Sequence, residues 1–482
     1  MSIPFVPLYI NGQAKPASTD AAFDVHNPYS NEVVTRAASA SRQDCQDAVA
    51  AAVQAFRSWE HSLLAERRDI FLKAADLLRT ERYKTKVLAA MTEEICSVEF
   101  LANFNVEIAT GMLRYVAGMI TELKGETFPS VKRGGHVIAQ RRAQGVVLGI
   151  APWNSPLVLS IRAMALPIIC GNTVILKTSE VSPRVHYTVA ELFEEAGLPH
   201  GVLNLVHMSR EDAPARTAEI IAHPAVRSIN FTGSDRVGRI LAAEAAKYLK
   251  PCVLELGGKA PAVVLEDADI QTAARAITSS ALLHSGQICM STERVIVSRK
   301  VSEALTKAIV AEFSKFKSGG PGERIAAQFT AGSAEGIVSL LREAQAGGAK
   351  ILLGNVSREG AVVQPHVVAG VKPGMRLWDR ESFGPVTIIA EFDSIDEAID
   401  LANATEYSLV GSVWTKDLNN AMDVAMRVRA GCMNVNGPTI HVEDAREHVG
   451  LGGASGYGTF SVESFTDVRM IVIHPSSPTS YP

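Results

Sequence analysis

The stretch that decides the fold covers residues 145–180 and reads "GVVLGIAPWNSPLVLSIRAMALPIICGNTVILKTSE". Its apolar runs at 145–150 and 173–177 have the length of buried strands. The first half of the stretch is uncharged over a length that could span a membrane, but Pro152 and Pro156 interrupt it. We therefore expect a strand, a turn and the start of a helix here, followed by a second strand.

The same alternation continues to about residue 258. Three more strand-like runs, "GVLNLV", "SINFT" and "CVLEL", are separated by helix-like segments. In one of these segments Ser182 stands at the N-cap, Pro183 at the first helical position and Gly197 at the stop. Apolar strands that alternate with helices indicate a parallel sheet covered on both faces, a Rossmann-like α/β architecture that binds dinucleotides.

The flanking segments divide the rest of the chain. Helical periodicity begins near residue 40, where Ser41 and Asp44 have capping-box spacing. A second α/β set follows residue 258 and ends near 435. Strand-like pieces at 136–144 and 468–475 lie outside both sets and could pair into a small sheet. Projecting strands of that kind often join subunits.

Composition narrows the class of protein. The 482 residues suggest two or three domains, and the net charge of −4 gives no reason to expect a nucleic-acid or membrane partner. Six cysteines without a C-x-x-C pair, and an N-terminus without a secretory pattern, favour a cytoplasmic protein. A metal could bind one acidic and histidine-rich cluster, but a solvated loop or helix face is the more common role, so we expect no metal. The cluster comprises His441, Glu443, Asp444, Glu447 and His448.

One cysteine lies among small and polar residues instead of apolar ones. Cys289 occurs in "LLHSGQICMSTER", after Gly286 and Gln287 and before a strand-like run. Structural cysteines usually sit in apolar surroundings, so this thiol is expected to be accessible. His284 could serve as the base of a cysteine hydrolase, although such partners are usually distant in sequence.

Asn154 and Glu255 are polar residues next to or inside two expected apolar strands. Asn154 lies in the turn that starts a helix, where its amide could donate to an oxyanion or simply cap the helix. Glu255 lies inside an apolar strand, where desolvation would raise its pKa toward that of a general base. A buried structural ion pair is the alternative for Glu255.

Two other strand ends carry groups suited to a dinucleotide. Lys177 ends an apolar strand and Glu180 follows it, a pair that suits the two hydroxyls of a ribose and would repel a 2′-phosphate. A surface ion pair is the alternative. Gly233 and Ser234 form a turn before a helix that contains Gly238, and backbone N–H groups at such a start can hold a pyrophosphate.

Together these motifs resemble the aldehyde dehydrogenase superfamily over roughly residues 8–475. The likeness is carried by seven segments: "PWN" (152–154), "LKTSE" (176–180), "FTGS" (231–234), "LELGGK" (254–259), "GQIC" (286–289), "ESFGPV" (381–386) and "NVNGPT" (434–439). "FNV" (104–106), "QICMSTER" and "NGPT" are most similar to the subgroup that oxidises salicylaldehyde, vanillin and benzaldehyde. The chain departs from the pattern at His284 and Ser285, where many relatives have an Asn-Gln pair.

The resemblance implies a role for each matching residue. Cys289 is the nucleophile, Asn154 and the Cys289 backbone N–H form the oxyanion hole, and Glu255 is the general base. The implied cofactor-binding residues are Trp153, Lys177, Glu180, Phe231, Gly233, Ser234, Gly238, Leu256, Glu381 and Phe383. The expected substrate pocket includes Phe104, Arg162, Met290 and Tyr457.

The resemblance also implies the reaction and the domain plan. We expect NAD-dependent oxidation of an aromatic aldehyde of the salicylaldehyde, vanillin or benzaldehyde kind, through a cysteine thiohemiacetal and a thioester. A CoA-acylating or aliphatic semialdehyde dehydrogenase and an inactive NAD-binding or structural protein are the alternatives. The expected parts are an NAD-binding domain (1–122 and 144–255), a catalytic domain (256–440) and a β oligomerisation arm (123–143 and 460–482). The arm would build a homodimer or a dimer of dimers.

Overall fold

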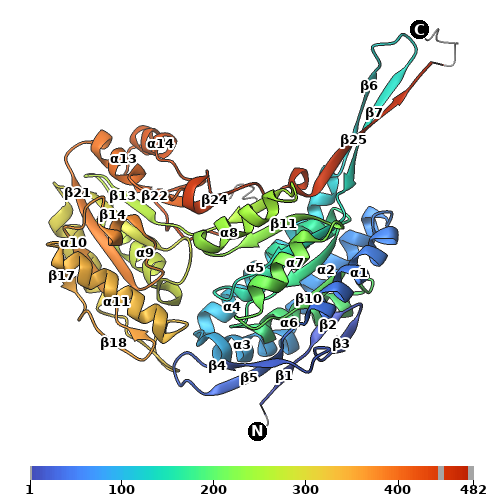
Figure 1. Ribbon diagram of the computed structural model, residues 1–482. Coiled ribbons are helices and arrows are strands. Elements are labelled where there is room, and N and C mark those ends of the chain that lie inside the picture. The colour runs from blue at the N-terminus through green and yellow to red at the C-terminus, as the bar shows by residue number, and fades with distance from the viewer. Residues whose placement is uncertain (1–2, 443–449, 476–482) are drawn as a thin grey trace.

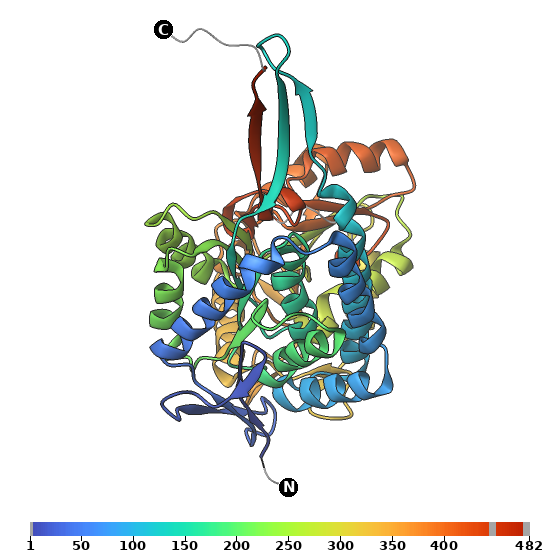
Figure 2. The same ribbon diagram turned by 90° about the vertical axis from the view of Figure 1, so that its right-hand side faces the viewer.

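The computed structural model describes residues 3–442 and 450–475. It has two α/β parts, each built on a mostly parallel sheet, and a β arm that projects away from both (Figure 1). Figure 2, turned by 90°, shows the same arm standing clear of the helices. The expected α/β class is confirmed, whereas the exact domain boundaries stay predictions.

The first sheet has eight strands. In spatial order they are β24 (Gly456–Tyr457), β12 (Cys252–Glu255), β11 (Val226–Thr232), β8 (Val146–Ile150), β9 (Thr173–Lys177), β10 (Leu203–Val206), β2 (Leu8–Ile10) and β3 (Gln13–Lys15). The five central strands are parallel, and β24, β2 and β3 are antiparallel to their neighbours. Ile150 pairs with Lys177 and Thr232 with Glu255, so the carboxyl ends of these strands share one edge.

Both faces of this sheet are buried, which explains why its strands read as continuous apolar runs. Along β8, Val147 belongs to one hydrophobic cluster, while Val146 and Leu148 belong to the cluster on the opposite face. The first face is covered by α2 (Leu64–Leu78), α3 (Glu81–Ile95), α4 (Glu99–Gly118), α5 (Pro156–Ile169) and α6 (Pro183–Ala196). The second is covered by α1 (Arg42–Trp59), α7 (Ala213–Ala222) and α8 (Asp235–Ala246).

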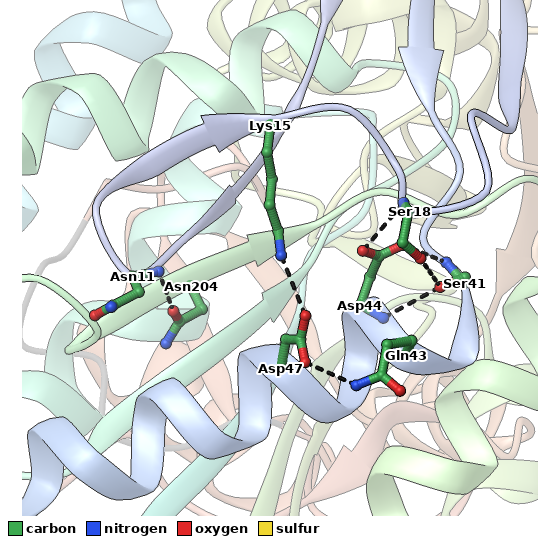
Figure 3. Close-up of polar contacts among 8 residues, drawn as sticks. All are labelled: Asn11, Lys15, Ser18, Ser41, Gln43, Asp44, Asp47 and Asn204. Carbon is green, nitrogen blue, oxygen red and sulfur yellow. Dashed lines mark hydrogen bonds and ion pairs between the residues drawn. The ribbon is translucent and has the colours of Figure 1, made fainter.

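Helix α1 begins where the capping pattern predicts. Ser41 Oγ accepts a hydrogen bond from the Asp44 N–H at 3.1 Å, and the Asp44 carboxylate accepts from the Ser41 N–H at 2.9 Å (Figure 3). The same carboxylate accepts from the Ser18 N–H at 3.0 Å, and Lys15 on β3 forms an ion pair with Asp47 at 3.3 Å. These contacts hold the β2–β3 hairpin against α1. The hairpin forms one edge of the sheet, so this edge strand is covered by the helix.

The second sheet has seven strands. In spatial order they are β17 (Lys350–Leu353), β20 (His366–Ala369), β21 (Val386–Phe392), β14 (Thr292–Ser298), β13 (Ala260–Val264), β22 (Val410–Trp414) and β23 (Cys432–Val435). All pairs are parallel except β17 with β20. The helices of this part are α9 (Ile270–Leu282), α10 (Ser302–Phe313), α11 (Ala331–Ala346), α12 (Arg376–Asp379), α13 (Ile395–Asn403) and α14 (Leu418–Arg427).

The arm joins segments that are far apart in sequence. Its strands are β6 (Glu126–Pro129), β7 (His136–Ala143) and β25 (Thr466–Ile473), with β7 in the middle. The pairing of the two strand-like pieces that flank the cores is confirmed, because β7 and β25 run antiparallel from Ala143↔Thr466 to His136↔Ile473. Near the N-terminus β1 (Phe5–Val6), β5 (Val33–Ala38) and β4 (Ala22–His26) form a further small sheet. Among the described residues, no helix is long and apolar enough to cross a membrane.

Candidate active site

The three residues predicted to be catalytic line one cavity of about 150 Å³. Asn154 comes from the turn between β8 and α5, Glu255 ends β12, and Cys289 lies just before β14. Asn154 and Glu255 meet because neighbouring parallel strands place their carboxyl ends at the same edge of the sheet. Cys289 is brought to this edge from the second α/β part.

The cavity wall is largely apolar. Helix α4 contributes Phe104, Ile108, Met112 and Tyr115, which lie three or four residues apart on one helix face. Helix α5 contributes the facing wall. Of the predicted pocket residues, Phe104, Arg162 and Met290 line this cavity. Tyr457 lies on β24 with 49% of its surface exposed, and it is not part of the cavity wall.

Asn154 is fixed beside the cysteine loop. Its Nδ2 donates a hydrogen bond to the Gln287 carbonyl at 2.9 Å, and its side chain is buried. A primary amide has two N–H donors, so one can hold the loop while the other faces the cavity. The N-cap of α5 is Ser155, so Asn154 does not cap the helix; its side chain binds the cysteine loop and lines the cavity that contains Cys289.

Two glycines allow the cysteine loop to pack tightly. A Cβ on Gly258 would lie 2.0 Å from the Cys289 carbonyl oxygen, and a Cβ on Gly286 would lie 2.0 Å from the Gly384 carbonyl oxygen. Gly286 also has a φ of +76°, which side chains rarely adopt. The segment that contains Cys289 therefore packs closely against the β12–β13 loop through Gly258 and against the loop before β21 through Gly286.

Glu255 is buried in the cavity wall and forms an ion pair. Its Oε2 lies 2.6 Å from Nη1 of Arg162, and only 2% of its side chain is exposed. The guanidinium carbon of Arg162 lies 3.9 Å from the centre of the Phe460 ring. The carboxylate therefore has a buried partner, as the structural alternative for Glu255 predicts, and it also faces the space next to Cys289.

His284 is placed differently from the other candidates. It lies in the 3-10 turn η2 (Leu283–Gly286) with a φ of 51°, and its ring packs edge-on against Trp153 at 5.9 Å between centres. Neither ring nitrogen has a hydrogen-bond partner among the described residues, and burial lowers the pKa of His284 to about 4. His284 is absent from the cavity wall that contains Cys289, so this geometry does not support a cysteine–histidine hydrolase.

The depressed pKa makes a stability prediction. Between pH 6.5 and about 4 the unfolded chain binds a proton at His284 and the folded chain does not, so stability falls as the pH drops through this window. The loss at pH 4 is about 3 kcal/mol for a shift of this size. His284→Asn, whose side chain tolerates a positive φ, should melt at a higher temperature than wild type at pH 4.5, with a smaller difference at pH 7.5. His200→Asn, at an exposed histidine, is the control and should leave the melting temperature unchanged at both pH 4.5 and pH 7.5.

The proposed ribose and phosphate residues lie along the carboxyl edge of the first sheet. Lys177 ends β9, where burial lowers its pKa and the charge of Glu180 partly opposes that shift. Ser234 caps α8, with its Oγ accepting from the Val237 N–H at 3.4 Å. Gly238 is in the first turns of α8. The buried side chain of Leu256 lies beside it, and the Phe231 ring lies beside Gly233.

Glu381 and Phe383 belong to the loop that packs on the cysteine segment. Glu381 Oε1 accepts from the Gly258 N–H at 2.8 Å, and burial, followed by the nearby Glu293 charge, raises the pKa of Glu381 to about 8. Phe383 has a φ of 50°, and its ring lies edge-on to Trp153 at 5.9 Å.

The sequence reading missed the residue that holds this loop. Glu293, buried at the start of β14, accepts from the N–H groups of Ser382 and Phe383 at 2.9 and 3.2 Å, and it pairs with buried Lys259. Glu255 was singled out as a charged residue inside an apolar strand, and the same pattern in "TERVIVS" would have indicated Glu293.

Within the described ranges no group of side chains could hold a metal ion. Glu443, Asp444, Glu447 and His448 of the acidic cluster lie outside those ranges.

Comparisons with known proteins give a consistent answer. The model of the "Aldehyde dehydrogenase family" matches residues 15–471. A vanillin dehydrogenase of Pseudomonas fluorescens is 40% identical over 99% of both chains, and a salicylaldehyde dehydrogenase of Pseudomonas putida is 37% identical over 97% of this chain and 98% of its own. The crystal structure of a salicylaldehyde dehydrogenase from Pseudomonas putida G7 complexed with salicylaldehyde is 36% identical, with a TM-score of 0.96 over the full length of both chains. An NAD-dependent aldehyde dehydrogenase from Sinorhizobium meliloti gives a TM-score of 0.93 at 31% identity over 100% of this chain and 97% of that one. These matches confirm the resemblance drawn from the motifs: the chain belongs to the aldehyde dehydrogenase family.

Proposed function

We propose that this aldehyde dehydrogenase oxidises an aromatic aldehyde to its carboxylic acid with NAD, through a covalent adduct on Cys289. The observation that carries the proposal is an apolar cavity with Cys289, Asn154 and Glu255 on its wall. A cavity of about 150 Å³ with apolar walls accommodates a benzene ring in other proteins. The relatives that act on vanillin and salicylaldehyde support the same substrate class.

The residues at the sheet edge fit NAD. The side chains of Lys177 and Glu180 can bind ribose hydroxyls, and the capped start of α8 can hold a pyrophosphate. Gly233 lets the Phe231 ring pack against this turn, because a Cβ at position 233 would lie 2.4 Å from that ring. Glu381, buried beside Gly258, is suited to the second ribose. Bound NAD supplies the acceptor for the hydride that leaves the carbonyl carbon.

The protein groups then have definite tasks. The Cys289 thiolate bonds to the carbonyl carbon, and the Asn154 amide and the Cys289 N–H donate to the oxygen as its negative charge develops. Loss of the hydride converts this thiohemiacetal into a thioester. Glu255 takes a proton from water, the resulting hydroxide attacks the thioester, and the C–S bond breaks to release the carboxylic acid and the thiolate.

Asn154→Ala should remove one donor to the developing oxyanion. We expect kcat to fall by roughly 10²- to 10³-fold, the usual effect of losing one such donor. Because Asn154 also binds the Gln287 carbonyl, thermal melting should be compared at the same time. Asn154→Asp, which is isosteric but replaces the amide donor with an acceptor, should be at least as slow; wild-type rates in Asn154→Asp would contradict the role.

Substrate class is tested with a kinetic panel. We expect benzaldehyde, salicylaldehyde and vanillin to give higher kcat/KM values than acetaldehyde or succinate semialdehyde, with NADH absorbance as the signal. The free acid should form without coenzyme A. Higher kcat/KM values for the aliphatic aldehydes would favour an aliphatic semialdehyde dehydrogenase, and a product that requires coenzyme A would favour a CoA-acylating one. NAD binding without turnover of any aldehyde would favour an inactive NAD-binding protein.

We further propose that the protein forms homodimers or dimers of dimers in the cytoplasm. Along β25, Val468, Met470, Ile471, Val472 and Ile473 are each more than one third exposed. Leu418, Met422 and Met426 form an exposed apolar stripe on α14, close in sequence to the edge strand β23. A second copy would cover these surfaces. The free thiols of Cys45, Cys96, Cys170 and Cys252 suit a reducing compartment.

Sedimentation should therefore report a dimer or a tetramer. Met470→Glu, which places a charge on the exposed face of the arm, should shift the population toward monomer. A monomeric wild-type protein at micromolar concentration would contradict this assembly.

A further inference from the structure

The ion pair between Arg162 and Glu255 is unusual in its surroundings. Arg162 lies on the second turn of α5 and Glu255 at the end of β12, with 15% and 2% of their side chains exposed. Both line the largely apolar cavity that contains Cys289. Moving two charges into such a place costs free energy, so the arrangement needs a reason beyond stability.

A third side chain holds the arginine in place. The Phe460 ring lies 3.9 Å from the guanidinium carbon, which is the stacking distance of a close cation–π contact. Phe460 follows β24 and is itself buried in the cavity wall. The guanidinium is therefore fixed between an aromatic face and a carboxylate, and its planar shape suits both contacts.

Few titratable or charged groups surround Glu255. The cavity wall adds the thiol of Cys289, the phenol of Tyr115 and the imidazole of His441. The strand partners of Glu255 are Thr232 on β11 and Gly456 on β24, and neither is charged. Among the described residues that line the cavity, Arg162 is the one with a permanent positive charge.

This placement has a chemical consequence. A general base must be ionised, but desolvation drives a buried carboxyl toward its protonated form. A guanidinium in contact favours the carboxylate instead. We propose that Arg162 is the positioning residue for thioester hydrolysis: it keeps Glu255 ionised and oriented for the second half of the reaction. The proposal rests on the role proposed for Glu255.

The two half-reactions give this proposal a distinct signature. NADH forms before hydrolysis, so an enzyme with an impaired base should release NADH in a burst and then stall as the thioester. We expect Arg162→Met to show a burst close to one NADH per site, with a steady-state rate on the order of 10- to 100-fold lower than wild type. The acid limb of its steady-state pH profile should move to higher pH, so that activity recovers as the pH rises.

Matched variants separate this role from damage to the pocket. Arg162→Lys keeps a cation and should lie between wild type and Arg162→Met in both burst and pH profile. Phe460→Leu removes the stack and keeps the ion pair, and its shift of the acid limb should be smaller than that of Arg162→Met. Hydroxylamine attacks thioesters without a protein base, but it also converts aldehydes to oximes. It is therefore added after a burst that has consumed a stoichiometric amount of aldehyde, and it should rescue Arg162→Met by releasing the acyl group from Cys289 as the hydroxamic acid.

These measurements test the role of Arg162 separately from the role of Glu255. If Arg162→Met slows the burst and the steady state equally, with an unmoved acid limb and no rescue by hydroxylamine, Arg162 only shapes the pocket and the inference is wrong. If Glu255→Gln also lacks a burst while Cys289→Ala is inactive, the role of Glu255 itself fails. A burst in Glu255→Gln without one in Arg162→Met would overturn the inference alone.

Discussion

Cys289→Ala is expected to eliminate aldehyde-dependent NADH formation. The substitution removes the sulfur that is proposed to bond to the carbonyl carbon, and alanine offers no substitute nucleophile. We expect kcat to fall by on the order of 10⁴-fold or more, as when nucleophiles are removed from other covalent enzymes. NAD titration followed by protein fluorescence should still give a wild-type affinity, because the proposed ribose-binding and phosphate-binding residues remain.

A second cysteine provides the matched control. Cys252 lies on β12, where burial raises the pKa of its thiol to about 11, so this thiol stays protonated near neutral pH. Cys252→Ala should retain activity within about twofold of wild type, since a half-buried, protonated thiol behaves as a small apolar group. Comparable losses in Cys252→Ala and Cys289→Ala would show that the assay reports folding instead of nucleophilic attack.

Glu255→Gln is expected to separate oxidation from hydrolysis. The amide has nearly the same shape as the carboxylate and cannot take a proton from water at neutral pH. We expect steady-state kcat to fall by roughly 10²- to 10⁴-fold, the usual contribution of a general base. Rapid mixing should still show a first turnover of NADH at a rate close to that of wild type.

Glu381→Gln is the informative contrast, because it alters a second buried carboxyl at the proposed cofactor site. Its main effect should be on the KM for NAD, without a burst followed by a stall. If Glu255→Gln slows the first turnover as much as the steady state, Glu255 acts before hydride loss and the assigned role is wrong.

Local pattern was sufficient for much of the fold and part of the site. Alternating apolar runs predicted the parallel strands from β8 to β12, and the spacing of Ser41 and Asp44 predicted the start of α1. Glu255 could be singled out as a charged residue inside an apolar strand, and Asn154 as an amide in the turn between a strand and a helix. Their meeting in one cavity follows from the parallel sheet.

The remaining features depend on contacts between distant segments. The Arg162–Glu255 pair joins a helix to a strand, Phe460 contacts Arg162 from beyond β24, and Glu293 binds the loop between α12 and β21. Nothing in the periodicity of a single segment specifies such partners, because they are set by packing. Tyr457 illustrates the same limit: it was expected in the substrate pocket, but on β24 it is 49% exposed and lies outside the cavity wall.

The central claim is that Cys289 carries the acyl group of the substrate inside this cavity. The most direct test mixes Glu255→Gln with NAD and benzaldehyde, quenches in acid within seconds and maps the modified peptide by mass spectrometry. We predict one benzoyl group per subunit on the peptide that contains Cys289, and none when NAD is omitted. NADH formation with an unmodified Cys289 peptide, or with the benzoyl group on another residue, would contradict the account.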